Sequence, residues 1–158
     1  MAHELTHVDQ SGAARMVDVA GKEITARRAV AAGSVRTTAE VIALLHDGAL
    51  PKGDALAVAR IAGIMGAKRT PDLIPLCHPI ALHGVTVDLT LRNETVDIEV
   101  TTRTADRTGV EMEALTAVAV AGLAVVDMVK GLDKSVELTD VRLVAKTGGR
   151  SGDWHREP

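Results

Sequence analysis

The clearest pattern of apolar and polar positions lies between residues 85 and 101. Every second residue of VTVDLTL (85–91) is apolar, and the same alternation returns in VDIEV (96–100) after a turn at Asn93-Glu94. Period-two alternation places apolar side chains on one face of a strand and polar side chains on the other. This stretch therefore predicts an antiparallel hairpin with one buried face.

Three further segments have strand patterns. MVDVA (16–20) and TARRAVAAGSVR (25–36) predict two strands joined by a turn at Gly21-Lys22, and VRLVA (141–145) predicts a strand near the end. A glycine-rich tail, KTGGRSGDW, follows the last of these strands.

Helical patterns fill the intervening segments. TTAEVIALLHDG (37–48) predicts a helix with Thr37 and Glu40 as a capping box. Asp54 predicts the cap of a second helix that ends near Arg69. Three prolines between residues 70 and 79 predict a rigid, non-helical loop, and residues 110–130 predict a long helix.

Helices that alternate irregularly with strands around an antiparallel hairpin indicate an α+β sandwich with helices on one sheet face. The 158 residues suit one domain, 1–158, with flexible segments at about 1–12 and 147–158. The apolar stretch 114–126 is too short to span a bilayer, so no membrane partner is expected.

Composition excludes several classes of protein. A net charge of −3 and a single aromatic residue, a Trp, argue against a nucleic-acid partner. The single cysteine excludes an intrachain disulfide, and the N-terminal residues do not resemble a secretory signal. We therefore expect a soluble, cytoplasmic protein.

The long helix suggests an assembly. Glu113 and Asp127 are 14 residues apart, so they project within roughly 40° of each other but about 21 Å apart along the axis. One small ligand could contact both only if a second copy of the chain brought the far end back. Because the residues between them are small and uncharged, we expect a homo-oligomer with sites between subunits.

Charged residues near the helix ends have two interpretations each. Asp127 and Lys130, at i and i+3, could form a surface ion pair or an acid and base that tune each other. Lys52, before the second helix, could be a solvated lysine or could hold a phosphate. The basic residues at both ends of the chain could bind an anion, although the tail could equally be a flexible terminus: Lys22, Arg27, Arg28, Lys146 and Arg150.

Cys77 and His78 are adjacent in DLIPLCHPI (72–80). On an extended segment neighbouring side chains point to opposite sides, so the two cannot form a nucleophile–base dyad with each other. A zinc site would need further ligands such as His46 or His83, which no spacing requires, so no metal is expected. We favour a buried cysteine with His78 in a polar cleft.

Several stretches together resemble the cyclic pyranopterin monophosphate synthase family of molybdenum cofactor biosynthesis. They run in order over nearly the whole chain: RMVDV, PKGD, ARIAGIMGAKRTPDLIPLCHPI, RTGVEMEALTAVAVA, DMVK and AKTGGRSGDW. The resemblance implies a ferredoxin-like fold in a hexamer, a trimer of dimers. It also implies a lyase that converts (8S)-3′,8-cyclo-7,8-dihydroguanosine 5′-triphosphate into cyclic pyranopterin monophosphate and diphosphate.

The resemblance also implies roles for named residues. Asp127 would be the acid/base, with Lys52, Lys130 and His78 as further catalytic residues. The substrate contacts would come from Leu76, Cys77, His78, Glu111, Met112, Glu113, Asp18, Lys22, Arg27 and Lys146. No cofactor is firmly implied, although Mg²⁺ could accompany the substrate phosphates.

Three local departures from the family pattern occur: Ala20-Gly21, Arg150, and the two valines that flank Asp127-Met128. They leave every charged catalytic position in place. Two other functions are alternatives to the family's reaction. A non-catalytic oligomeric nucleotide-binding paralogue would not need Lys52, Asp127 and Lys130 together, and a metal-dependent hydrolase would need a ligand cage that the sequence lacks.

Overall fold

The predicted hairpin forms as β2 (Leu82–Leu91) and β3 (Thr95–Asp106) in the computed structural model, which describes residues 6–158. Val87 lies opposite Val100 and Leu89 opposite Ile98, so the alternating apolar residues share one face. The turn closes where the Arg92 N–H donates a hydrogen bond to the Thr95 carbonyl at 2.8 Å.

Three more strands complete an antiparallel sheet of order β2-β3-β1-β4-β5. They are β1 (Thr25–Arg36), β4 (Glu137–Thr147) and β5 (Trp154–His155). The strand β4 extends beyond the predicted 141–145 at both ends, and β5 was not predicted.

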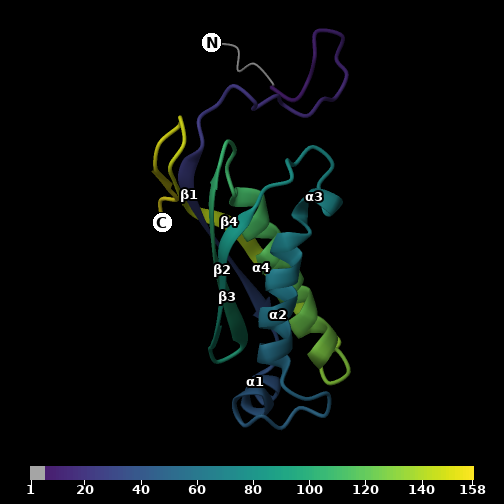
Figure 1. Ribbon diagram of the computed structural model, residues 1–158. Helices are drawn as coiled ribbons and strands as arrows, with labels where there is room; N and C mark the ends of the chain where they lie inside the picture. The colour runs from purple at the N-terminus through teal and green to yellow at the C-terminus, as the bar shows by residue number, and fades with distance from the viewer. Residues whose placement is uncertain (1–5) are drawn as a thin grey trace.

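In the described part of the chain, four helices accompany the sheet: α1 (Ala39–His46), α2 (Ala55–Lys68), α3 (Thr70–Leu73) and α4 (Glu111–Val129). The two long ones, α2 and α4, lie side by side and cover one face of the sheet (Figure 1). With one helical crossover between β1 and β2 and another between β3 and β4, this is the predicted ferredoxin-like α+β fold.

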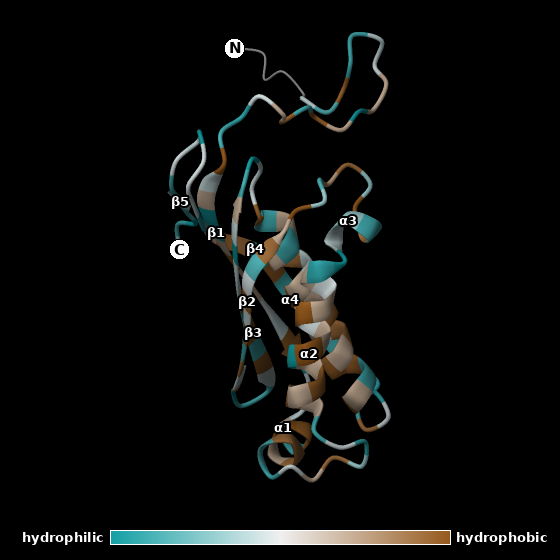
Figure 2. Ribbon diagram, in the orientation of Figure 1, coloured by the Kyte–Doolittle hydropathy of each residue, from teal (hydrophilic) through white to brown (hydrophobic). Residues whose placement is uncertain are grey.

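Aliphatic residues build the core between the sheet and the two helices. Val35, Ile98, Val118 and Val125 are fully buried there. Figure 2 shows apolar residues over most of α2, including the side turned away from the sheet. By length and composition α4 could cross a membrane, but its packing against the sheet and α2 is that of the core helix of a globular domain.

The predicted strand at 16–20 is wrong. The Asp18 carboxylate accepts a hydrogen bond from the Ala20 N–H at 2.8 Å, and the Lys22 N–H donates to the Val19 carbonyl at 3.0 Å. These local bonds turn the chain, so the segment runs irregularly to β1 and pairs with no strand of residues 6–158.

Two predictions at helix ends also need correction. Thr38 rather than Thr37 caps α1, accepting from the Val41 N–H at 3.3 Å, because the Thr37 hydroxyl donates to the buried Asp133 carboxylate at 2.8 Å. Residues 70–73, expected to be non-helical, form α3, where Pro71 is tolerated because it lies in the first turn. Asp54 caps α2 and α4 spans most of 110–130, as predicted.

The terminal segments were predicted to be flexible. The first five residues of the N-terminal segment lie outside the described residues. In the C-terminal segment, β5 pairs with β4, Trp154 opposite Lys146 and His155 opposite Ala145. Flexibility itself stays a prediction at both ends.

Candidate active site

The predicted site residues fall into two groups at opposite ends of α4. Asp127 and Lys130 lie at its C-terminal end, beside Lys52 in the loop between α1 and α2. The remaining residues lie around the N-terminal end of α4, the loop before β2, and the ends of β1 and β4. The helix holds the groups apart, as the spacing of Glu113 and Asp127 predicted.

The lysine-aspartate cluster is Lys52, Asp127 and Lys130. The Lys130 ammonium lies 2.7 Å from Asp127 Oδ1, while Lys52 Nζ lies 3.8 Å from Oδ2 and donates to the Asp127 backbone carbonyl at 2.8 Å. The hydrogen bond from Lys130, with the charges of both lysines, lowers the pKa of Asp127 below its ordinary value. All three side chains are about half exposed or more, so the cluster is open to a ligand.

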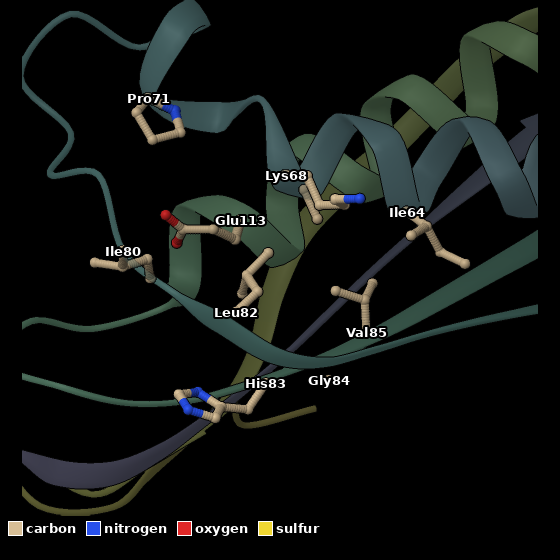
Figure 3. Close-up of a pocket in the computed structure, with 10 residues that line it drawn as sticks. Ile64, Lys68, Pro71, Ile80, Leu82, His83, Gly84, Val85 and Glu113 are labelled. Carbon is tan, nitrogen blue, oxygen red and sulfur yellow. The ribbon is translucent and has the colours of Figure 1, made fainter.

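In the other group, at the N-terminal end of α4, Glu113 is a buried carboxyl group. Only 1% of its surface is exposed, and its Oε2 atom has no hydrogen-bond partner within residues 6–158. Burial raises the pKa of Glu113 to about 7, so near neutral pH the residue can hold a proton or give it up. Figure 3 shows its carboxylate pointing toward Pro71 and Ile80 in a cavity of about 320 Å³, with the Lys68 ammonium directed away.

Cys77 lies directly beside this acid. Its Sγ donates a hydrogen bond to Glu113 Oε1 at 3.8 Å. Burial, together with the neighbouring carboxylates, raises the pKa of the thiol to about 11. A thiol held neutral is a poor nucleophile and a poor metal ligand. Cys77 is half-buried rather than buried as predicted, and its neutral thiol forms part of a cavity wall.

His78 is oriented by the N-terminal segment. Its Nε2 lies 2.5 Å from the Val17 carbonyl, and because a carbonyl can only accept, Nε2 carries the hydrogen. In the neutral ring Nδ1 is then an acceptor. His78 lines a cavity of about 480 Å³ together with Leu76, Cys77, Glu111 and Met112, so five predicted contacts meet in one place.

The predicted basic residues of this group do not all line the same cavity. Lys22 and Arg27 line a cavity of about 460 Å³. Lys146 instead pairs with Glu111, with Nζ 3.4 Å from Oε1 and both side chains about a quarter exposed. Asp18, exposed in the turn before β1, holds that turn together and contacts neither basic residue by hydrogen bond or ion pair within the described chain.

Nothing between residues 6 and 158 forms a metal site: no three His, Cys, Asp or Glu side chains cluster closely enough to bind an ion. His46 bonds to Asp47 at 3.2 Å and His83 accepts from the Ala105 N–H at 3.3 Å. Neither histidine forms a metal-binding cluster with Cys77 in the described residues.

Sequence reasoning missed three parts of these sites. It did not name Lys68, which lines the Glu113 cavity, or the Val17 carbonyl that orients His78. It named Arg150 among the cations that could bind an anion but left it out of the substrate contacts, although Arg150 lines the basic cavity. Only the Arg150 contact had a signal in the sequence, a cation within a glycine-rich run.

Comparison with known proteins gives a consistent result. Residues 16–149 match the family model described as the MoaC family. A protein of Streptomyces coelicolor named cyclic pyranopterin monophosphate synthase is 64% identical over 152 residues, covering 96% of this chain and 89% of the relative. A protein of the same name from Nocardioides sp. is 61% identical, covering 96% and 95%. The Mycobacterium tuberculosis H37Rv protein named cyclic pyranopterin monophosphate synthase 2 is 58% identical, covering 97% and 92%.

Proposed function

Since the chain belongs to the MoaC family, we propose that it is a lyase of molybdenum cofactor biosynthesis, with the reaction for which its relatives are named. The substrate is (8S)-3′,8-cyclo-7,8-dihydroguanosine 5′-triphosphate, and the products are cyclic pyranopterin monophosphate and diphosphate. The observation that carries this proposal is the cluster of Lys52, Asp127 and Lys130, three charged side chains that converge on one point.

The phosphate chemistry needs cations and a base. A hydroxyl oxygen of the sugar-derived part attacks the α-phosphorus, the bond from that phosphorus to the bridging oxygen breaks, and diphosphate leaves. The hydroxyl proton passes to a base as the new ester bond forms. The charge that develops on the leaving group is stabilised by nearby ammonium groups. Lys52 and Lys130 can supply these cations, and Asp127 can take the proton.

The rearrangement of the purine-derived rings needs protons to be given and taken repeatedly. Glu113, whose pKa is about 7, can do both near neutral pH. His78 presents its ring at the cavity that Leu76, Glu111 and Met112 also line. We assign the ring chemistry to this end of α4, with Lys146 balanced by Glu111 at its edge.

Both groups can serve one substrate only if two subunits contribute, so the proposal includes a homo-oligomer, a hexamer by family resemblance. On α2 the side chains of Val58, Ile61 and Met65 are 45%, 60% and 52% exposed. They recur at helical spacing and form an apolar stripe, which suits burial against another copy. Leu123 on α4 is likewise 58% exposed.

The remaining assignments complete the proposal. A cytoplasmic location fits the free thiol of Cys77, and Mg²⁺ would enter only with the substrate phosphates. The non-catalytic paralogue is not favoured, because the lysine-aspartate cluster is complete and its members touch.

The decisive experiment supplies the purified protein with the cyclic dihydro-GTP substrate and measures both products. We expect the wild type to form cyclic pyranopterin monophosphate and diphosphate in equal amounts. Lys52→Ala and Lys130→Ala should each reduce kcat severely, by about a hundredfold or more, because each removes a cation that faces the developing charge. Lys134→Ala, on the loop after α4, is a matched control. Wild-type turnover retained in both cluster variants would contradict the catalytic assignment.

A further inference from the structure

The glycine-rich run between β4 and β5 is the loop of a hairpin. Lys146 pairs with Trp154 and Ala145 with His155 in antiparallel register. Arg156 strengthens the pairing, since its backbone N–H donates to the Val144 carbonyl at 2.8 Å and its Nε to the Leu143 carbonyl at 2.7 Å. Both ends of the loop are therefore attached to the sheet.

Hydrogen bonds within the loop hold its tip. The Gly148 N–H donates to Asp153 Oδ1 at 3.2 Å, the Gly152 N–H to the Gly149 carbonyl at 3.2 Å, and Lys146 Nζ to the Ser151 hydroxyl at 2.8 Å. Arg150 lies between these bonded residues. The hairpin therefore gives Arg150 a defined position at the edge of the basic cavity.

Gly149 brings the loop against Arg27. Its φ is +80°, which side chains disfavour, and a Cβ built there would lie 2.3 Å from Arg27 Nη1. Arg27 is also held at the end of β3, because its Nε donates to the Asp106 carbonyl at 3.0 Å. The guanidinium is thus fixed between the end of β3 and the loop, beside Arg150.

The cavity between these groups is cationic. Lys22, Arg27 and Arg150 line its wall together with a single carboxylate, Glu23, and its volume is about 460 Å³. Within residues 6–158 none of the three cations forms an ion pair, whereas Lys146 is already paired with Glu111. Unpaired guanidinium groups bind phosphate oxygens through two parallel hydrogen bonds.

We propose that Arg150, carried on the β4–β5 hairpin, is a phosphate-binding residue that holds the terminal phosphates of the substrate together with Lys22 and Arg27. This inference rests on the proposed function for the identity of the triphosphate. The two phosphates that Arg150 holds are those that leave as diphosphate, so it determines specificity for a triphosphate over a monophosphate. Its role is binding, whereas proton transfer and stabilisation of the charge at the adjacent α-phosphorus remain with Asp127, Lys52 and Lys130, contributed by another subunit.

The test measures binding of inorganic diphosphate by calorimetry to wild type, Arg150→Gln, Arg150→Lys and the control Arg142→Gln, an exposed arginine of β4. We expect Arg150→Gln to weaken diphosphate binding by about 10-fold to 100-fold, Arg150→Lys to weaken it less, and the control to bind as wild type does. Inorganic monophosphate should distinguish the variants far less. Equal diphosphate affinity in wild type and Arg150→Gln, or no binding to wild type, would overturn the inference.

Turnover separates this inference from the proposed function. With the cyclic dihydro-GTP substrate, Arg150→Gln should raise KM about tenfold or more and change kcat little. If wild type binds diphosphate through Arg150 but forms no pyranopterin, the proposed function fails and the phosphate site stands. If wild type turns over and Arg150→Gln matches it in KM and in diphosphate binding, only the inference fails.

Discussion

A buried carboxyl group without a full set of partners is costly, and Glu113 is such a group. Within residues 6–158 the only side chain that donates a hydrogen bond to its carboxylate is the weak donor Cys77, and its second oxygen has no hydrogen-bond partner. Such a side chain lowers the free energy of unfolding once it ionises. A residue of this kind in a cavity is a candidate for function, since a packing role would be filled better by an apolar side chain.

The pH dependence of stability tests this burial. The folded-state pKa of Glu113 is about 7, above the ordinary value of 4.5. Below pH 4.5 both states are protonated and the contribution is fully present, whereas from pH 4.5 to 7 the unfolded chain ionises first. The free energy of unfolding should therefore fall by roughly 3 kcal/mol across this window, at about 1.4 kcal/mol per pKa unit. Urea unfolding of wild type and Glu113→Gln at pH 5 and pH 8 measures the difference.

In Glu113→Gln this pH-dependent loss should disappear, because the amide does not titrate. The two proteins should therefore differ most at the higher pH, where Glu113→Gln should be the more stable of the two. A parallel pH dependence in both proteins would mean that Glu113 ionises normally.

The neighbouring Cys77 and His78 should respond differently to substitution. Because the pKa of Cys77 is raised to about 11, its thiol stays neutral, and Cys77→Ala should keep activity within about tenfold of wild type. His78→Ala removes a ring that lines the cavity, and it should reduce kcat by about a hundredfold or more. Steady-state turnover of both variants checks this, with far-ultraviolet circular dichroism as the folding control. Equal losses in the two would contradict the assignment.

At the scale of elements, the closeness of α2 and α4 depends on small residues. A Cβ at Gly66 would lie 2.8 Å from the Val120 Cβ, and one at Gly63 would lie 3.2 Å from the Ala121 Cβ. The two helices therefore meet nearly backbone to backbone. This contact places Lys52, just before α2, against the end of α4.

Gly66→Ala should destabilise the protein by about 1–3 kcal/mol, because the added methyl overpacks the contact with α4. Helix propensity alone predicts the opposite, a gain of about 0.5–1 kcal/mol. Gly131→Ala is the control, since a Cβ there meets nothing within 4 Å. Thermal unfolding of the three proteins decides, and a Gly66→Ala protein as stable as wild type would show that the helices can separate at no cost.

Local patterns predicted the elements whose partners are local. The hairpin at 85–101 and the Asp54 cap follow from neighbouring residues alone. Neighbouring residues could not show that Thr38 rather than Thr37 caps α1. The Thr37 hydroxyl donates instead to Asp133, which is 96 residues away in the sequence. The short strand β5 was missed for a different reason: its partner β4 is close in sequence, but two residues are too few to show an alternating pattern.

At the scale of the molecule, the candidate site is divided between two ends of one helix. The separation could be predicted, because the spacing of Glu113 and Asp127 along a helix fixes it. The contacts of Glu113 with Cys77 and of His78 with Val17 could not, because they join segments that no periodicity relates.

Mixing inactive subunits tests the shared site. His78→Ala and Lys130→Ala subunits, unfolded together and refolded, should regain activity, because a site can take His78 from one subunit and Lys130 from the other. At equal amounts, about a quarter of the sites should be intact by random association. Each variant refolded alone is the control. Mixed samples no more active than the controls would place both residues of a site in one subunit.

The length of α4 has a consequence for insertions and deletions. One inserted residue between Glu113 and Asp127 would turn everything beyond it by about 100° and advance it by about 1.5 Å. Asp127 and Lys130 would then leave Lys52, and Val129 would leave the core. A four-residue insertion would nearly restore the direction but lengthen the helix by about 6 Å. Working proteins of this design can therefore vary in length in their loops and termini, while the register within α4 stays constant.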